Sequence, residues 1–127
     1  MKRNIKEILL ALKKEDYLKN ADLHIHSYES DGMLSPVEIV KLAKERNLKY
    51  IAISDHNTID AYINTNILSE EIVIPAVEFD CLYKGIVLHI LGYGIDIDNK
   101  DLRKLCAKTK LGRSRNIVRL FNLRNPK

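Results

Sequence analysis

The chain has 127 residues, of which 46% are hydrophobic and 30% charged, a size and composition typical of one soluble globular domain with a buried core. It contains no run of about 18 apolar residues, so no membrane-spanning helix is expected. The net charge of +4 is uneven, because residues 100–127 hold ten of the 21 basic residues and one of the 17 acidic ones. That basic segment could contact phosphates, although such a charge run is more commonly a solvated surface.

Apolar residues recur at helical spacing near the N-terminus and predict an amphipathic helix over residues 3–19. We therefore divide the chain into an N-terminal helix, residues 1–20, and a main domain, residues 21–127. The two cysteines, Cys81 and Cys106, lack the Cys-x-x-Cys spacing of a metal or redox motif, which favours a reducing, cytoplasmic setting.

A short apolar strand is expected at residues 21–26, and it carries two of the four histidines of the chain, His24 and His26. Alternate residues of a strand point to the same face, so the two imidazoles project side by side. That arrangement suits two rings that share one metal ion. A loop follows the strand, with a turn indicated by Asp31 and Gly32.

The start of the next helix has a strong signature. Ser35, Pro36 and Glu38 stand at its N-cap, N1 and N3 positions, and the helix is expected to run to about Asn47. Residues 49–54 then predict a second strand, which is apolar enough to be buried on both faces.

Polar residues stand directly after this second strand. Asp55 and His56 are placed where the strand ends, and Thr58 is expected to cap a short helix over residues 59–66. An Asp-His pair in such a place is either functional or an incidental combination of a capping residue and a surface histidine.

Two more strands are expected, at residues 72–82, where Pro75 interrupts the pattern, and at residues 86–93. Each contains a residue that is unusual in an apolar strand, Glu78 in the first and His89 in the second. A strand carboxylate between apolar neighbours needs a partner or a metal ion. His89 has the same need, although a satisfied core histidine is an alternative.

The turn between these two strands leaves two registers open. A turn at residues 83–84 would place Glu78 directly opposite His89, whereas a turn at residues 84–85 would place Asp80 opposite His89 and make Glu78 its diagonal neighbour. Both registers keep Glu78 and His89 on one face of the hairpin, whereas a three-residue loop would not.

The alternation of apolar strands and helices predicts an α/β fold with parallel strands, in which ligands collect at the carboxyl ends of the strands. All four histidines lie at such ends or beside a strand carboxylate. Each alone has an ordinary structural explanation, but their joint occurrence predicts a metal site. Nitrogen and carboxylate ligands without a thiolate favour zinc, manganese or iron.

These motifs together resemble the PHP (polymerase and histidinol phosphatase) family over roughly residues 21–120. The segments that carry the resemblance are Asp22-Leu23-His24-Ile25-His26-Ser27, Ser30-Asp31-Gly32, Ser54-Asp55-His56-Asn57-Thr58, Val77-Glu78 and His89-Ile90-Leu91-Gly92-Tyr93. The resemblance implies a distorted β/α barrel and a centre of two or three divalent ions (Mn, Zn, Fe or Mg) that hydrolyses phosphoesters.

The same resemblance implies a set of site residues. The metal ligands would be His24, His26, Asp31, His56, Glu78 and His89, with Glu78 bridging two ions. Asp55 would belong to the catalytic set by orienting a ligand rather than by binding an ion. Ions about 3.5–4 Å apart can bind phosphate oxygens and generate hydroxide near neutral pH, so no protein nucleophile is required.

The chain departs from the family pattern in its length. A closed β/α barrel needs about 250 residues, whereas this chain supplies about four strands with flanking helices. We therefore expect a partial, incomplete distorted barrel of PHP type, and no histidine follows His89 to complete the ligand set. Such a chain would be truncated or completed by a partner, and its open barrel edge would favour self-association.

Two functions remain open for the sequence. The first is a metal-dependent phosphoesterase or phosphatase, a hydrolase acting on a small phosphomonoester or a nucleotide. The second is a non-catalytic metal- or phosphate-binding module that a partner chain completes. An aromatic content of 6% and the lack of a stacking motif give a nucleic-acid partner little support.

A last helix is expected from Asn99, as its cap, to about Leu123. Arg115 and Arg119 are four residues apart and would share one face of it. That face either stays in solvent or binds a substrate phosphate, for which the planar guanidinium is chemically suited.

Overall fold

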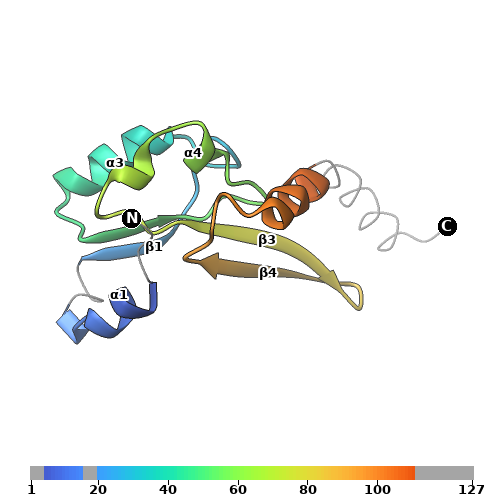
Figure 1. Cartoon of the computed structure of the whole chain (residues 1–127), viewed down its shortest axis with the longest axis horizontal. Helices are drawn as coiled ribbons and strands as arrows, with labels where there is room; N and C mark the ends of the chain where they lie inside the picture. The colour runs from blue at the N-terminus through green and yellow to red at the C-terminus, as the bar shows by residue number, and fades with distance from the viewer. Residues whose placement is uncertain (1–4, 16–19, 111–127) are drawn as a thin grey trace.

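The computed structural model describes residues 5–15 and 20–110 (Figure 1). Its elements in chain order are α1 (Ile5–Ala11), β1 (Ala21–Ile25), α3 (Pro36–Glu45), β2 (Tyr50–Ile53), α4 (Asp60–Ile63), the 3-10 helix η1 (Ile67–Ser69), β3 (Ala76–Tyr83) and β4 (Ile86–Tyr93). A final helix covers residues 100–110. Within these described ranges, no helix combines the length and the apolar character needed to cross a bilayer.

The strands form two connected pairs. β1 and β2 are parallel, with Ala21 opposite Tyr50, and β3 and β4 form an antiparallel hairpin. Residues 72–74 run parallel to β2, because the Ile51 amide donates to the Ile72 carbonyl at 2.8 Å and the Ile74 amide donates to the Ile51 carbonyl at 2.8 Å. The predicted parallel arrangement is therefore confirmed for β1 and β2, and residues 72–74 continue it.

The strand expected over residues 72–82 is divided in two. Residues 72–74 make only a bridge to β2, and β3 begins at Ala76. Pro75 stands at the break, where it has no backbone N–H to donate to a neighbouring strand. The division lets β3 leave the parallel layer and pair with β4.

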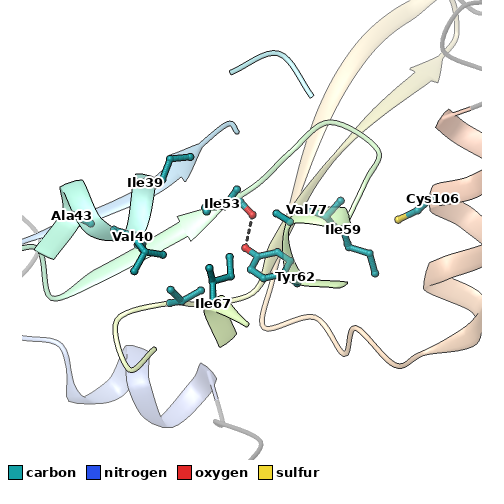
Figure 2. Packing of buried hydrophobic residues seen from close by; sticks show 12 residues of the cluster. Ile39, Val40, Ala43, Ile53, Ile59, Tyr62, Ile67, Val77 and Cys106 are labelled. Carbon is teal, nitrogen blue, oxygen red and sulfur yellow. Dashed lines mark hydrogen bonds between the residues drawn. The ribbon is translucent and has the colours of Figure 1, made fainter. Parts of the chain in front are cut away.

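The helices α3 and α4 lie on one face of the β1–β2 pair (Figure 1). α3 begins with the predicted capping box, in which Ser35 Oγ accepts from the Glu38 amide at 3.2 Å and the Glu38 carboxylate accepts from the Ser35 amide at 2.8 Å. Ile39 and Ala43 of this helix pack in one buried cluster with Ile53 of β2 (Figure 2). The cluster fixes α3 against the strands that carry the polar site.

Tyr62 of α4 joins the parallel layer to the start of β3 from within the core. Its hydroxyl donates to the Ile53 carbonyl (Figure 2). The same hydroxyl accepts from the Ala76 amide at 3.0 Å. Burial raises the pKa of this hydroxyl. Tyr62 therefore satisfies backbone groups at the break that Pro75 creates, and it stays protonated while doing so.

The helical predictions were less accurate than those for the strands. The helix expected over residues 3–19 was wrong in its extent, since α1 ends at Ala11 and residues 12–13 are not helical. Leu9 and Leu10 of α1 are exposed, and a short helix with little packing gains little stability from tertiary contacts.

The short helix after β2 also differs from the prediction, because α4 begins at Asp60 and ends at Ile63 rather than spanning residues 59–66. Thr58 Oγ1 accepts from the Asp60 amide at 3.1 Å, although Ile59 holds the N-cap position. The last helix begins as predicted, with Asn99 Oδ1 accepting from the amide of Leu102 at 3.0 Å. Its expected end at Leu123 lies outside the described residues.

The hairpin adopts the second of the two registers left open by the sequence. Asp80 stands opposite His89, and the turn is formed by Lys84 and Gly85. Both turn residues have positive φ, 48° and 78°, as a tight two-residue hairpin turn requires. Glu78 is therefore the diagonal neighbour of His89, on the same face of the hairpin.

Candidate metal centre

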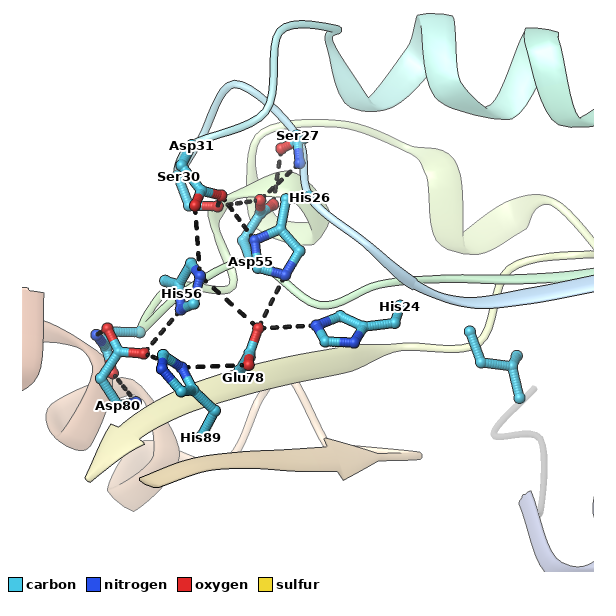
Figure 3. A network of polar contacts seen from close by, with 12 residues as sticks. His24, His26, Ser27, Ser30, Asp31, Asp55, His56, Glu78, Asp80 and His89 are labelled. Carbon is cyan, nitrogen blue, oxygen red and sulfur yellow. Dashed lines mark hydrogen bonds and ion pairs between the residues drawn. The ribbon is translucent and has the colours of Figure 1, made fainter. Parts of the chain in front are cut away.

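The structure brings His24 and His26 together around one carboxylate oxygen. Glu78 Oε2 lies 2.9 Å from His24 Nε2 and 2.8 Å from His26 Nε2 (Figure 3). The two rings come from the end of β1, and their centroids are 5.1 Å apart. His24 belongs to β1, His26 directly follows that strand and Glu78 belongs to β3, so donors that are distant in sequence converge as a tridentate metal site requires.

Glu78 is the centre of the whole cluster and is only 4% exposed. Its Oε1 lies 3.3 Å from His89 Nδ1, and its Oε2 lies 3.8 Å from His56 Nε2. Burial acts to raise the pKa of Glu78, but the hydrogen bond from His24 and the charges of the surrounding histidines outweigh it and hold the pKa below its usual range. The carboxylate is therefore anionic at neutral pH.

The backbone explains why Glu78 meets His56. The Glu78 amide donates to the Asp55 carbonyl at 3.1 Å, and the Glu78 carbonyl accepts from the Asn57 amide at 2.8 Å. These bonds form a parallel bridge between His56 and Glu78. The segment that follows β2 is thereby attached to β3 at the centre of the site.

Asp31 turns toward the histidines rather than toward solvent. Its Oδ1 lies 2.7 Å from His26 Nδ1 and its Oδ2 lies 3.4 Å from His56 Nε2. Burial acts to raise the pKa of Asp31, but the hydrogen bond and charge of His26, together with the charge of His56 and the hydrogen bond from Ser30, hold it below its usual value. A Cβ atom at Gly32 would stand 2.0 Å from the His26 carbonyl oxygen, so only glycine lets this turn approach so closely.

Asp55 is bonded to the loop that carries Asp31. Asp55 is buried, and its carboxylate accepts from the Ser27 amide and the Ser27 hydroxyl, both at 2.7 Å, and from the Ser30 hydroxyl at 2.6 Å. These bonds hold the segment that places Asp31 beside His56. If Asp55 orients a metal ligand, as the sequence predicts, that ligand is Asp31, and the bonds to Ser27 and Ser30 are the connection between them.

The sequence reasoning did not select Asp80 as a site residue. Its Oδ1 lies 2.8 Å from His56 Nδ1 and 2.9 Å from His89 Nδ1 (Figure 3). The signal that could have found it is the alternation of the strand, because Asp80 is two positions from Glu78 and shares its face. Its place opposite His89 also belonged to one of the two registers considered.

The described donors form three overlapping groups, and within each group one ligand atom per residue lies within 4.8 Å of the others. The groups are His24, His26 and Glu78; His26, Asp31 and His56; and His56, Glu78 and His89. A metal ion with bonds of about 2 Å can reach donors up to about 4 Å apart. Imidazole nitrogens and carboxylate oxygens without thiolates fit zinc, manganese or iron.

Two predicted site residues cannot be placed in this arrangement. Arg115 and Arg119, the expected phosphate contacts, lie outside the described residues. The described helix over residues 100–110 contacts α4 through Lys110, whose ammonium donates to the Asp60 carboxylate at 2.6 Å on the surface.

Comparisons with known proteins find relatives that are similar in sequence. A 5'-3' exoribonuclease from Haemophilus influenzae is 32% identical over 105 residues, which cover 80% of this chain and 38% of that protein. A 3',5'-nucleoside bisphosphate phosphatase from Chromobacterium violaceum is 33% identical over 82 residues, covering 62% of this chain and 29% of the relative.

A solved structure is also similar. A protein from Bifidobacterium adolescentis, described as a proposed metal-dependent phosphoesterase, aligns with a TM-score of 0.68 and 28% sequence identity, covering 77% of this chain and 35% of its own. The chain thus spans between 29% and 38% of the length of these three proteins. The few strands described here correspond to part of a larger barrel. Because residues 22–121 match the PHP domain family, the chain belongs to that family.

Proposed function

We propose that this chain carries a divalent-metal centre for the hydrolysis of a phosphoester, on a nucleotide or another small phosphorylated molecule. The observation that carries the proposal is the buried carboxylate of Glu78, which is met by four histidines. Four imidazoles around one carboxylate supply the nitrogen and oxygen ligands that divalent ions such as zinc bind in proteins.

The proposed ligands are those predicted from the sequence. They are His24, His26, Asp31, His56, Glu78 and His89, with two or three ions (Mn, Zn, Fe or Mg) in the complete site. When bound, the ions would supply Lewis acidity and an activated water. Glu78 and Asp31 contribute permanent negative charge, because the pKa of each carboxyl lies below its usual range.

The relatives guide the choice of substrate. One is named for the hydrolysis of RNA from its 5' end and another for a nucleoside bisphosphate. Both substrates present a phosphate on a ribose, so a nucleoside 3',5'-bisphosphate is the first compound to test. Arg115 and Arg119 remain proposed phosphate contacts of this reaction.

A second function is a metal- or phosphate-binding module that a partner chain, or a second copy, completes. The observation that favours it is the exposure of apolar residues along β4, among them Ile86, Leu88 and Ile90. Such residues on an edge strand are a surface on which further strands can pair.

The proposed cellular setting is the cytoplasm. Both cysteines are free thiols, with Cys106 buried on the core-facing side of the last described helix and Cys81 partly buried in β3. Free thiols persist in reducing compartments. Expression in reducing and oxidising compartments of one host, followed by comparison of soluble yield and thiol content, tests this setting.

The decisive experiment on function combines metal analysis with turnover. The purified chain is loaded with Mn²⁺ or Zn²⁺ and assayed for phosphate release from a nucleoside 3',5'-bisphosphate, beside size-exclusion chromatography. Metal-dependent release that disappears with a chelator supports the phosphoesterase. Saturable metal binding without release favours the module, and the absence of metal binding would contradict both.

A further inference from the structure

The carboxylate of Asp80 occupies a position that the proposed ligand set does not explain. Its Oδ1 stands between two histidines, 2.8 Å from His56 Nδ1 and 2.9 Å from His89 Nδ1. It lies on the same face of β3 as Glu78, one pleat further along the strand. Asp80 therefore contacts two proposed metal ligands from the side of the hairpin.

Asn57 holds this carboxylate in place by two reciprocal bonds. Asn57 Nδ2 donates to Asp80 Oδ2 at 2.9 Å, and Asn57 Oδ1 accepts from the Asp80 amide at 3.0 Å. Asn57 has a φ of 56°, a left-handed conformation that asparagine tolerates better than most residues. With Oδ2 committed to Asn57, Oδ1 is the oxygen that faces the histidines.

The consequence for His56 follows from the chemistry of imidazole. A neutral imidazole carries one N–H, and the carboxylate that makes the shorter contact keeps the proton on the ring nitrogen that it faces. For His56 that contact is the 2.8 Å one between Nδ1 and Asp80, because the carboxylates at Nε2 are farther away. With Nδ1 donating to Asp80, the lone pair of His56 is on Nε2. That atom lies 3.4 Å from Asp31 Oδ2 and 3.8 Å from Glu78 Oε2, so it faces the other donors.

We propose that Asp80, held by Asn57, is a positioning residue that keeps the proton of His56 on Nδ1 and turns its Nε2 lone pair toward the metal centre. The proposal rests on the proposed function only in taking this cluster as a metal site. Carboxylates that orient a ligating histidine in this way typically raise metal affinity by about 10- to 100-fold.

The proton position is tested first, on the metal-free protein. Two-dimensional ¹⁵N–¹H NMR of the histidine rings at alkaline pH should find His56 in the Nδ1–H form. Asp80→Ala should convert His56 to the Nε2–H form or to a mixture. A His56 ring that is already Nε2–H in the unsubstituted chain, or that is unchanged by Asp80→Ala, would overturn the proposal.

Metal affinity is tested next, by calorimetric titration with Zn²⁺. Asp80→Ala should weaken binding by about 10- to 100-fold, while saturating Co²⁺ should restore the visible spectrum of the unsubstituted chain. Loss of one metal equivalent, or a changed spectrum at saturation, would show that Asp80 is itself a ligand and would overturn the positioning role.

A milder variant keeps the test valid if Asp80→Ala fails to fold. Asn57→Gly preserves the left-handed backbone and removes only the clamp, so affinity should fall several-fold in a folded protein. Asn47→Gly is the matched control, because Asn47 has the same φ of 56° at the end of α3, and it should bind metal normally. Equal affinities in the two glycine variants would contradict the proposal.

Neither readout depends on turnover. A chain that releases no phosphate but shows the expected proton position and affinity loss would contradict the phosphoesterase and leave the role of Asp80 intact. A chain that releases phosphate normally, but whose His56 ring is unaffected by Asp80→Ala, would support the phosphoesterase and contradict the role of Asp80.

Discussion

The two ends of the β3–β4 hairpin have similar apolar sequences and opposite environments. At the base, Val77 is 1% exposed and Glu78 is 4% exposed. Toward the tip, Leu82 is 48% exposed and Ile86 is 62% exposed. The base lies against the strands of the parallel layer, whereas the tip extends away from them (Figure 1).

Burial along this hairpin therefore depends on what each residue packs against rather than on its hydrophobicity. A carboxylate is buried at the base because histidines from β1, from the segment after β2 and from β4 surround it. Isoleucine and leucine are exposed at the tip, where the paired strands have only each other to pack against. Substitutions at the base should therefore change metal affinity or stability strongly, and matched substitutions at the tip should change them little.

The largest effect is expected for Glu78→Gln. The amide keeps the size of the side chain but removes the charge that all four histidines face, so metal affinity should fall by at least about 100-fold, the upper range for residues that merely support a ligand. Leu88→Gln toward the tip is the control and should bind metal normally. Calorimetric titration with Zn²⁺ measures both, and equal affinities would remove Glu78 from the centre of the site.

The next largest effect is a loss of stability at Asp55, which holds the loop over residues 27–30 against the base of the hairpin. Asp55→Ala leaves the buried Ser27 amide and hydroxyl without their acceptor and should lower the free energy of unfolding by about 3 kcal/mol. Asp98→Ala, which removes an exposed ion pair with Arg103, should cost less than about 1 kcal/mol. Urea unfolding compares them, and similar costs would mean that the Asp55 network does not hold the loop.

A pair of identical substitutions tests packing directly. Val77→Ala removes two buried methyl groups and should cost about 2 kcal/mol. Val87→Ala removes the same atoms from a residue that is 39% exposed and should change stability by less than about 0.5 kcal/mol. Thermal unfolding of the two variants should separate them by several degrees, and coincident transitions would contradict the contrast between base and tip.

The smallest effect concerns a single hydrogen bond at the base. The Tyr93 hydroxyl donates to the Leu23 carbonyl at 2.7 Å and connects the end of β4 to β1. Tyr93→Phe should cost about 1 kcal/mol. Tyr83→Phe, at the exposed tip, should leave stability unchanged within error. A Tyr93→Phe chain as stable as its Tyr83→Phe counterpart would show that this connection contributes nothing.

The sequence was most informative where the chemistry depends on local geometry. The spacing of His24 and His26 predicts two rings on one face, and they meet at Glu78 in the structure. The sequence also predicts two alternative hairpin registers, which differ in the two residues that form the turn and therefore in the residue that stands opposite His89. Lys84 and Gly85 form the turn, both with positive φ, and the hairpin then places Asp80 beside His89.

The sequence was least informative about features that depend on contacts between distant parts of the chain. Helical spacing cannot show that α1 ends at Ala11, because a short helix depends on what packs against it. Strand alternation places Asp80 on the face of Glu78 but does not show that Asn57 clamps it, since Asn57 comes from a different part of the chain. The bonds from Asp55 to the Ser27–Ser30 loop are hidden for the same reason.

Metal analysis of the purified chain shows whether a metal centre forms around Glu78. The purified chain and its Glu78→Gln variant are saturated with Zn²⁺ or Mn²⁺, freed of loosely bound ions by desalting, and analysed for metal per chain. We expect at least one tightly bound ion per unsubstituted chain and a clear loss in the variant. An unsubstituted chain without bound metal, or a variant that retains the same amount, would contradict a metal centre built around Glu78.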